Sequence, residues 1–253
     1  MAIPHITIIT ATLNCAGTLR DTLESVLAQT FCDYEYIVVD GGSQDETLKI
    51  IKEYEPRFSG KLKWTSEPDK NLYDALNKGI GMAMGDVVGI LNADDFYSSP
   101  NILVTVARTM EDRNIEAVYG DVHYVRREET DKTVRYYSSR IFRPWLMRLG
   151  FMPAHPSFYC RRECFLTHGL YDTSFRVAAD FELLLRIIYL GHIHMRYLPL
   201  DFVTMRRGGI SSSGMRSYLQ IMRDHLRALK KNGVYSNVLL LSLRYIYKVW
   251  ELR

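Results

Sequence analysis

The chain has 253 residues, of which 47% are hydrophobic and 24% charged, with a formal net charge of +3. This composition is typical of a globular protein and excludes a disordered or fibrous chain. The length suits one large domain or a domain with a helical appendage. Four cysteines are too few for a disulfide scaffold, and no apolar run approaches the roughly 20 residues of a membrane span.

The first part of the chain alternates between apolar, β-branched runs and helical patterns. The runs predict strands over residues 6–12, 35–40, 62–66 and 86–91. The patterns after them predict helices over about 16–29, 44–55, 71–83 and 102–113. This alternation indicates an α/β fold with a mainly parallel sheet that helices cover on both faces. The first run lacks a basic leader, which favours a buried strand over a signal peptide and hence a cytoplasmic protein.

The second part of the chain has a different pattern. Residues 116–140 alternate and predict a hairpin, and residues 195–207 read as extended. Helices are predicted over 161–172 and 177–191, and two amphipathic helices end the chain. We therefore predict a catalytic domain over 1–210 and basic amphipathic helices over 211–253.

Ligands of open α/β sheets bind outside the carboxyl ends of the strands. The segments that follow the predicted strands are 10–14, 40–43, 67–69 and 92–95, and three of the four carry carboxylates. Asp94 and Asp95 are hard oxygen ligands that suit Mg²⁺ or Mn²⁺ shared with phosphates, although such residues also cap helices. Asp40, before two glycines, could accept hydrogen bonds from a nucleobase or ribose.

Asp180 and Glu182 stand in the first turn of the helix predicted over 177–191. Carboxylates are common there because the helix dipole favours anions, so ordinary helix-start chemistry is one interpretation. The other is that Asp180 is a general base. A step of two residues turns Glu182 about 200° away, so only one of the two can face a cleft.

Taken together, these segments resemble the family 2 glycosyltransferases of the GT-A fold, over about residues 6–209. The similar segments are ITIITATLN, IVVDGGSQDET, SEPDKNLYDALNKGIGMAMGDVVGILNADDFY, HPSFYCRRECFLTHGLYD and VAADFELLLRI. The resemblance implies a bacterial enzyme of polysaccharide or lipopolysaccharide assembly. It would use a nucleotide-sugar donor, UDP-linked by family analogy with dTDP and GDP sugars as alternatives, a divalent cation (Mn²⁺ or Mg²⁺), and a glycan or lipid-linked acceptor.

The resemblance also assigns donor-side roles. It implies nucleotide contacts at Thr10, Ala11, Thr12, Asp40 and Asp69, with Asn77 and Lys78 nearby. Asn92, Ala93 and Asp94 occupy the family's D-x-D position, so Asp94 would meet the cation that bridges the diphosphate. The first aspartate of that motif is replaced by Asn92 here, with Asp95 in a position to compensate.

On the acceptor side, the resemblance makes Asp180 the catalytic base of an inverting displacement. Arg206 and Arg207 match a late loop that contacts the diphosphate. His155 matches the start of an acceptor-side strand, although a histidine between two prolines also suits a structural role. Cys160 and Cys164 have no second pair to complete a metal site and read as packing residues.

The tail and the body differ in charge. Residues 201–253 hold ten Lys/Arg and three Asp/Glu, which leaves the first 200 residues with a net charge of −4. Basic amphipathic helices suit a peripheral membrane contact, but they could equally cover the body or a partner subunit. Two other functions stay open: a non-catalytic nucleotide-sugar binder and, against the acidic body, a nucleic-acid-binding protein.

Overall fold

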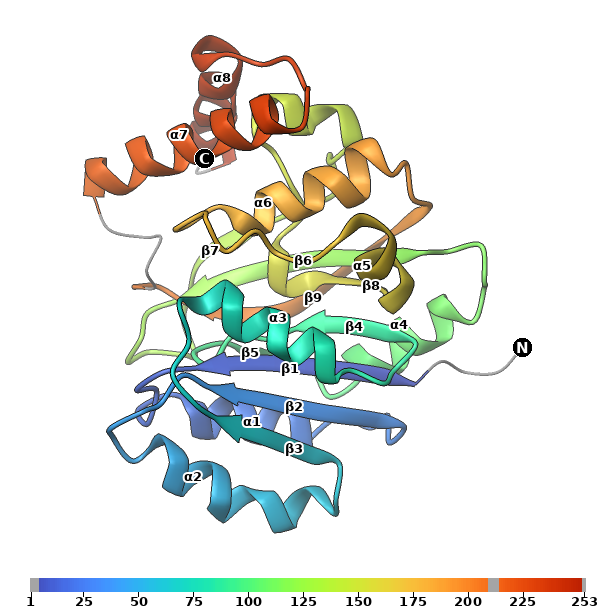
Figure 1. Cartoon of the computed structure of the whole chain (residues 1–253), viewed down its shortest axis with the longest axis vertical. Helices are drawn as coiled ribbons and strands as arrows, with labels where there is room; N and C mark the ends of the chain where they lie inside the picture. Colours follow the sequence, from blue (N-terminus) through green and yellow to red (C-terminus); the bar gives the residue numbers. More distant parts are fainter. Residues whose placement is uncertain (1–4, 209–213, 252–253) are drawn as a thin grey trace.

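The computed structural model describes residues 5–208 and 214–251, with side chains over 5–208 and 218–244. One mixed sheet has the strand order β3-β2-β1-β4-β8-β6-β9-β5, and β7 pairs with β6 (Figure 1). The strands are β1 (Ile6–Thr12), β2 (Tyr34–Asp40), β3 (Leu62–Ser66), β4 (Val87–Ile90), β5 (Phe96–Tyr97), β6 (Ala117–Val125), β7 (Thr133–Tyr137), β8 (Phe158–Arg161) and β9 (Met195–Arg206). The helices are α1 (Leu19–Leu27), α2 (Thr47–Tyr54), α3 (Leu72–Met82), α4 (Ile102–Met110), α5 (Arg162–His168), α6 (Ala179–Leu184), α7 (Gly214–Lys231) and α8 (Val238–Glu251).

The half of the sheet formed by β3, β2, β1 and β4 is parallel, as the alternating sequence pattern predicts. Every residue of β1 and β2 is buried, and successive side chains enter two separate cores. Ile6 and Ile8 of β1 pack in the core that contains α1, α2 and α4, whereas Ile9 packs in the core that contains α3 and α6. The α/β fold with helices on both faces is therefore confirmed.

The other half of the sheet is mixed rather than parallel. Strand β8 lies between β4 and β6 and is antiparallel to both, whereas β9 is parallel to β6 and antiparallel to β5. Local patterns predicted neither β5 nor β8, because two and four residues are too short for a periodic pattern, although the family resemblance implied a strand starting near His155. The predicted hairpin is confirmed as β6 and β7.

Two glycines allow aromatic side chains to cross this half of the sheet. A Cβ at Gly89 of β4 would lie 2.0 Å from the ring of Tyr159 on β8. A Cβ at Gly120 of β6 would lie 2.4 Å from the ring of Phe202 on β9. Any other residue at either position would push the strands apart.

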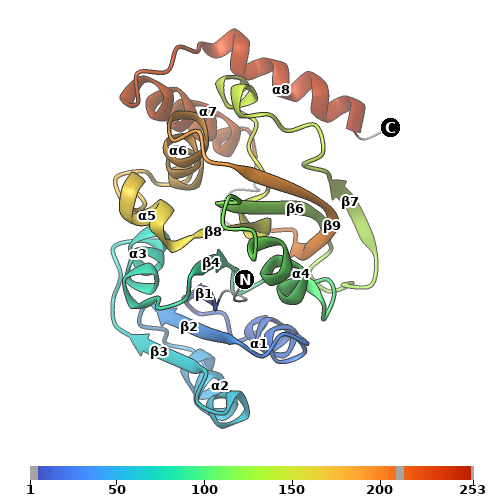
Figure 2. The same cartoon turned by 90° about the vertical axis from the view of Figure 1, so that its right-hand side faces the viewer.

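The C-terminal helices α7 and α8 lie together at one end of the molecule (Figure 2). The ring of His225 on α7 stacks on Phe181 of α6 at 3.9 Å. Arg244 of α8 is buried and reaches His225 at 2.8 Å, and Leu241 is fully buried beside it. The helices thus cover the body, which was one of the two expectations for the tail. The predicted boundary at 210/211 falls within 209–213, outside the described residues.

Within the described ranges, no helix has the length and apolar character needed to cross a membrane. The outward face of α8 nevertheless exposes three apolar side chains, Val238, Leu239 and Leu243.

Candidate functional site

The carboxyl ends of the first three strands meet at one edge of the sheet. Thr12 is paired with Asp40 across β1 and β2, and Asp40 is paired with Ser66 across β2 and β3. Helices α3 and α6 both begin on the side of the molecule to which these strands point (Figure 1). The predicted convergence of strand ends is therefore confirmed.

Asp40 holds the turn that follows β2. Its carboxylate accepts hydrogen bonds from the backbone N–H groups of Gly42 (3.0 Å) and Ser43 (2.9 Å) and from the hydroxyls of Ser43 (2.5 Å) and Ser66 (2.7 Å). The side chain is fully buried, and Gly42 has a φ of +86°, which explains the need for glycine. The carboxylate thus organises the turn and the neighbouring end of β3, and its predicted nucleotide contact remains a prediction.

Asp69 lies over the same turn. Its Oδ2 atom would be 3.3 Å from a Cβ added at Gly41, so glycine leaves room for the carboxylate. Lys78 of α3 forms ion pairs with Asp69 Oδ1 at 2.6 Å and with Glu67 at 2.7 Å, and these hydrogen bonds raise the pKa of Lys78. Among the described residues Asp69 Oδ2 has no hydrogen-bond partner although it is buried. A ligand that donates a hydrogen bond would satisfy it.

The three predicted contacts on β1 are not equivalent. The Thr10 hydroxyl donates to the Leu91 carbonyl (2.6 Å) and accepts from Tyr36 (2.9 Å) inside the sheet, and Ala11 packs in the core. Thr12 is the last residue of the strand, and its buried Oγ1 has no partner in the described part of the chain. Of the three side chains, Thr12 therefore offers a ligand a polar atom without a partner, and the nucleotide contacts over residues 10–12 remain predictions.

The loop after β4 is fixed by side chains from α1 and β9. Thr18, the N-cap residue of α1, and Thr22 of α1 donate to the carbonyls of Ala93 (2.9 Å) and Asp95 (2.7 Å), respectively. Arg206 of β9 donates through Nη1 to the Asp94 carbonyl at 2.7 Å. The loop backbone is thus held on one side by α1 and on the other by β9.

Asp94 and Asp95 have different surroundings. Asp95 is 1% exposed and accepts hydrogen bonds from Asn92 Nδ2 (2.8 Å) and from the Arg206 N–H (3.2 Å). Burial and the neighbouring Asp94 raise the pKa of Asp95 to about 8. Asp94 is half-buried, and its carboxylate has no side-chain partner within the described residues. Placement therefore differs from the prediction that both carboxylates meet a cation, since only Asp94 is accessible.

Asn92 explains how Asp95 can be buried. Its amide N–H₂ donates to the Asp95 carboxyl at 2.8 Å. The departure from the D-x-D pattern therefore places a hydrogen-bond donor beside Asp95.

The arginines near Asp94 also differ in their roles. Arg206 is 7% exposed, pairs with Asp21 of α1 and stacks over Phe96 at 5.0 Å, so it supports the loop from beneath. Arg207 is exposed at the end of β9. Burial raises the pKa of Asp94, and the charges of Arg206 and Arg127 oppose that rise. Arg127 lies in the charged turn after β6. The sequence alone does not distinguish it from the other charged residues of that turn.

Asp180 occupies the first turn of α6. It is half-buried, its Oδ1 accepts the N–H of Phe181 at 2.8 Å, and it has no ion-pair partner among the described residues. Burial raises the pKa of Asp180 to about 6. A carboxyl group with that pKa is ionised at neutral pH and still basic enough to accept a proton from a hydroxyl.

Glu182, the rival to Asp180, is committed to a buried network. It is fully buried and is bonded by Arg186 (2.8 Å), Lys231 (3.1 Å) and Asn232 (3.1 Å). Burial opposes its ionisation, but these bonds outweigh burial and lower the pKa of Glu182. It joins α6 to α7 and does not face solvent.

Three further candidates have structural contacts. Asn77 donates to the Tyr171 carbonyl and accepts the Tyr171 N–H, both at 2.9 Å, which differs from the predicted place near the nucleotide. His155 lies 2.5 Å from the Tyr171 hydroxyl, and burial lowers the pKa of His155 to about 4, so it is neutral. Cys160 and Cys164 are buried free thiols in the core, as expected.

A separate surface hollow of about 540 Å³ lies beside Arg161 and His194. None of the predicted site residues lines it. The strand edge, where the free carboxylates and unpaired acceptors gather, is therefore the candidate site.

The residues at this edge suit a divalent cation that is bound partly by the protein and partly by a phosphorylated ligand. No group of three or more His, Cys, Asp or Glu side chains in the described part of the chain could hold a metal. Asp94 supplies one accessible hard oxygen ligand, and Mg²⁺ is commonly bound by one or two carboxylates together with substrate phosphates and water. The donor set therefore fits an ion that arrives with a phosphorylated ligand.

A family model described as glycosyl transferase family 2 matches residues 7–169. The PGL/p-HBAD biosynthesis glycosyltransferase of Mycobacterium tuberculosis is 33% identical over 217 residues, which are 84% of this chain and 81% of the relative. Chondroitin synthase of Escherichia coli is 24% identical over 189 residues, which cover 75% of this chain and 27% of that protein.

Solved structures share the fold at low identity. S. aureus TarS in complex with UDP-GlcNAc has a TM-score of 0.68 and 18% identity, covering 89% of this chain and 66% of that one. The mannosyltransferase PcManGT from Pyrobaculum calidifontis, in complex with GDP-Man and Mn²⁺, has a TM-score of 0.64 and 16% identity, covering 100% and 82%. Asp180 lies beyond the span of the family model, so its role depends on the local geometry.

Proposed function

The chain belongs to glycosyl transferase family 2, and on that premise we propose that it transfers a sugar from a UDP-linked donor to an acceptor hydroxyl with inversion. Glycosyl transfer is the activity of the family. The proposal adds the donor nucleotide, the stereochemistry, the residues and the place where the protein works.

The observation that carries the proposal is the division of the carboxylates into free and committed groups. Asp40, Asp95 and Glu182 are buried in hydrogen bonds that hold turns, loops and helices. Asp94 and Asp180 keep their carboxylates free of side-chain partners among the described residues. An inverting transferase needs two such groups, one near the leaving diphosphate and one to take the acceptor proton.

Asp180 is the proposed base. Its carboxylate takes the proton of the acceptor hydroxyl as the oxygen attacks the anomeric carbon from the face opposite the leaving group. The new carbon–oxygen bond forms while the bond to the diphosphate breaks, and its electron pair leaves with the phosphate oxygen. The pKa of about 6 suits this step at neutral pH.

Thr12 and Asp69 are the proposed nucleotide contacts. Both present a buried oxygen without a partner in the described chain, so both can accept a hydrogen bond from an N–H group or a hydroxyl. Uracil has one such N–H, and the ribose has hydroxyls. TarS was solved in complex with UDP and PcManGT in complex with GDP-Man, so donors with uracil and donors with guanine both need to be compared.

Asp94 is the proposed ligand of Mn²⁺ or Mg²⁺. When bound, the ion would neutralise charge on the leaving diphosphate. Arg207 and Arg127, both exposed, are the proposed cationic contacts to the same group, while Arg206 holds the loop. Positive charge fixed near the leaving group is the kind of electrostatic stabilisation that contributes most to transfer reactions.

We further propose a lipid-linked or glycan acceptor at the cytoplasmic face of a membrane. Residues 132–162 and 225–250 contain no Asp or Glu, and they meet where Arg148 Nε donates to the Tyr235 carbonyl at 3.0 Å. Trp145 is 59% exposed and Leu239 78% exposed beside this basic region. An apolar and basic surface of this kind suits an anionic membrane.

The donor proposal is tested by thermal unfolding with a panel of UDP, dTDP and GDP sugars and Mn²⁺, since a ligand that binds the native state raises the unfolding temperature. Thr12→Val keeps the shape but removes the unpaired hydroxyl, so we expect several-fold weaker UDP-sugar binding without loss of stability. Thr10→Val is the matched control, because it removes an internally bonded hydroxyl and should lower stability without changing donor affinity.

The alternatives predict other results. A non-catalytic binder would show donor stabilisation without cation-dependent hydrolysis or transfer. A nucleic-acid-binding protein would be retained on DNA in a salt-dependent manner and would not respond to the sugar panel. Stabilisation by GDP or dTDP sugars alone would overturn the UDP proposal and leave the transferase proposal intact.

A further inference from the structure

The helix that carries Asp180 is capped only in part by its own sequence, through the Phe181 N–H that Asp180 accepts. Its N-cap residue is Ala178, whose side chain cannot accept a hydrogen bond. The first N–H groups of a helix need partners from elsewhere, and α6 is only six residues long before it continues as a π-helical turn. The position of the Asp180 carboxylate therefore depends on what holds the start of α6.

Tyr73 of α3 reaches this helix start. Its hydroxyl donates to the carbonyl of Val177. Burial and the charge of Asp180 raise the pKa of Tyr73. One hydroxyl of α3 is therefore bonded to the backbone two residues before the first residue of α6.

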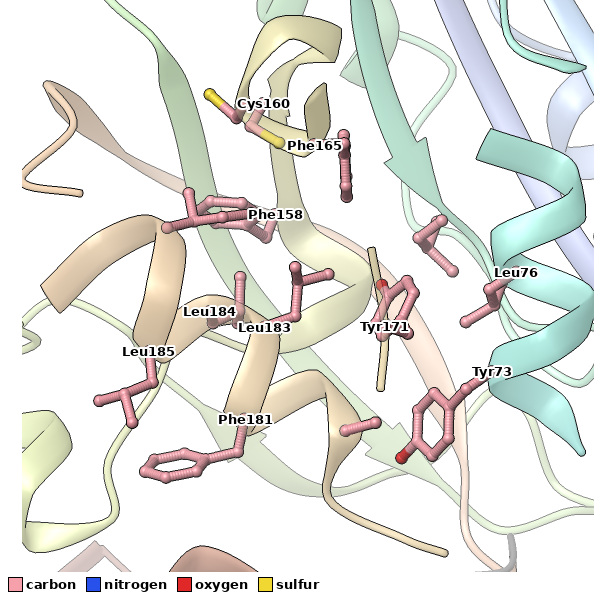
Figure 3. Packing of buried hydrophobic residues seen from close by; sticks show 14 of the residues in the cluster. Tyr73, Leu76, Phe158, Cys160, Phe165, Tyr171, Phe181, Leu183, Leu184 and Leu185 are labelled. Atoms are coloured by element: carbon pink, nitrogen blue, oxygen red, sulfur yellow. The ribbon is translucent and has the colours of Figure 1, made fainter. Parts of the chain in front are cut away.

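Other side chains of α3 hold the preceding segment. Asn71 donates to the Thr173 carbonyl at 2.8 Å, and Asn77 bonds both backbone groups of Tyr171. The rings of Tyr73 and Tyr171 stack at 5.5 Å. Figure 3 shows Tyr171 between Tyr73 and Leu76 of α3 on one side and Leu183 of α6 on the other. The segment from 171 to 177 is thus attached to α3 at several points.

We propose that Tyr73 is a positioning residue for glycosyl transfer, which acts by fixing the start of α6 and with it the Asp180 carboxylate. The inference rests on the proposed function, in which Asp180 is the base. It goes beyond that function because Tyr73 touches neither substrate nor proton. A displacement of about 1 Å of a catalytic group can lower a rate by about 10²-fold, so the contact has catalytic consequences.

The surroundings of Asp180 allow a specific readout. The titratable groups that face it are Tyr73 and Tyr171, whose pKa values are raised by burial and by the Asp180 charge. The Tyr171 hydroxyl is bonded to the neutral His155. Since burial is what raises the pKa of Asp180, a loosened helix start that admits water should lower that pKa toward the ordinary 3.8.

Tyr73→Phe is the test, because phenylalanine keeps the ring that stacks on Tyr171 and removes only the hydroxyl. We expect kcat to fall by about 10- to 100-fold with KM for the UDP sugar and nucleotide affinity unchanged. The acidic limb of the pH–rate profile should move below 6. Asn77→Ala should give the same pattern and serves as the second variant if Tyr73→Phe does not fold.

Tyr34→Phe is the matched control. The Tyr34 hydroxyl also donates to a backbone carbonyl, that of Val26 at 3.4 Å, but in the opposite core. This variant should lose stability and keep kcat and the pH profile. If Tyr73→Phe behaves like Tyr34→Phe, the positioning role is overturned and the base assignment stands. If Asp180→Asn keeps normal turnover, both the base assignment and the positioning role are overturned.

Discussion

Replacement of Asp180 by asparagine should separate catalysis from stability. Asparagine keeps the shape of the side chain and can still accept the Phe181 N–H, which lies 2.8 Å from Oδ1, but it cannot take a proton. We expect turnover to fall by about 10²- to 10⁴-fold, the usual contribution of a positioned base. Donor affinity should change little, because Asp180 lies on α6 and the proposed nucleotide contacts lie at the strand ends.

The same substitution should stabilise the protein at neutral pH. Burial raises the pKa of Asp180 from 3.8 to about 6, so the folded chain binds this proton more tightly than the unfolded chain does. A shift of about 2 units corresponds to about 3 kcal/mol of unfolding free energy at 1.36 kcal/mol per unit. In the wild type, the loss of unfolding free energy that comes from burying the Asp180 charge is absent below about pH 4. It grows between about pH 4 and 6 and is complete above about pH 6.

Two measurements check this reasoning. In a protein of this size, about 3 kcal/mol raises the unfolding temperature by roughly 6–12 °C, and that gain should be seen at about pH 7.5 and vanish near pH 4. The wild-type rate should fall about tenfold per pH unit below 6.

Glu182→Gln is the control for that experiment. It breaks the bonds with Arg186 and Lys231, which lower the pKa of Glu182. It should therefore destabilise the protein most at neutral pH, with the effect fading as the pH falls and Glu182 is protonated. If Asp180→Asn is destabilised at neutral pH as Glu182→Gln is, or keeps its turnover, the assignment of Asp180 is refuted.

Two further predictions concern the cation and the membrane. Asp94→Ala should abolish the Mn²⁺-dependent gain in nucleotide-sugar affinity measured by calorimetry, whereas Asp95→Asn, at a buried side chain held by Asn92 and by the Arg206 N–H, should keep it. Equal losses would show that both bind the ion. The double change Leu239→Ser and Leu243→Ser should reduce co-sedimentation with phosphatidylglycerol-containing vesicles by more than about tenfold, since each leucine contributes roughly 1.5–3 kcal/mol when buried. Leu166→Ser, at a 69% exposed position on α5, should leave vesicle binding unchanged, and equal binding by all variants would contradict the membrane contact.

The parallel half of the sheet can be predicted from sequence because its strands are long apolar runs between amphipathic helices. Each of β1 and β2 is seven residues and buried throughout. Strand β8 has four residues and owes its place to neighbours on both sides, with Gly89 making room for Tyr159. Its existence depends on contacts between distant segments, which a local pattern does not contain.

The candidate site likewise contains features that the sequence predicts and features that depend on contacts between distant segments. The positions of Asp94 and Asp180, after a strand and at a helix start, could be found from the sequence alone. Whether a carboxylate is free or committed could not, because that depends on partners far along the chain. Arg206 meets Asp21 across 185 residues, and Asn77 meets Tyr171 across 94. The sequence shows the charges but not these pairings.

Helix α3 makes contacts toward both parts of the proposed site. Lys78 pairs with Asp69, a proposed nucleotide contact, and the Tyr73 hydroxyl donates to the Val177 carbonyl just before the helix that carries the proposed base. If donor binding stabilises α3, it also favours binding of the acceptor. By thermodynamic reciprocity, acceptor binding must then favour donor binding by the same free energy. The two substrates should then bind with positive cooperativity, and the coupling should be of equal size whichever is added first. The helix would thus make the ternary complex more stable than the sum of its two binary complexes.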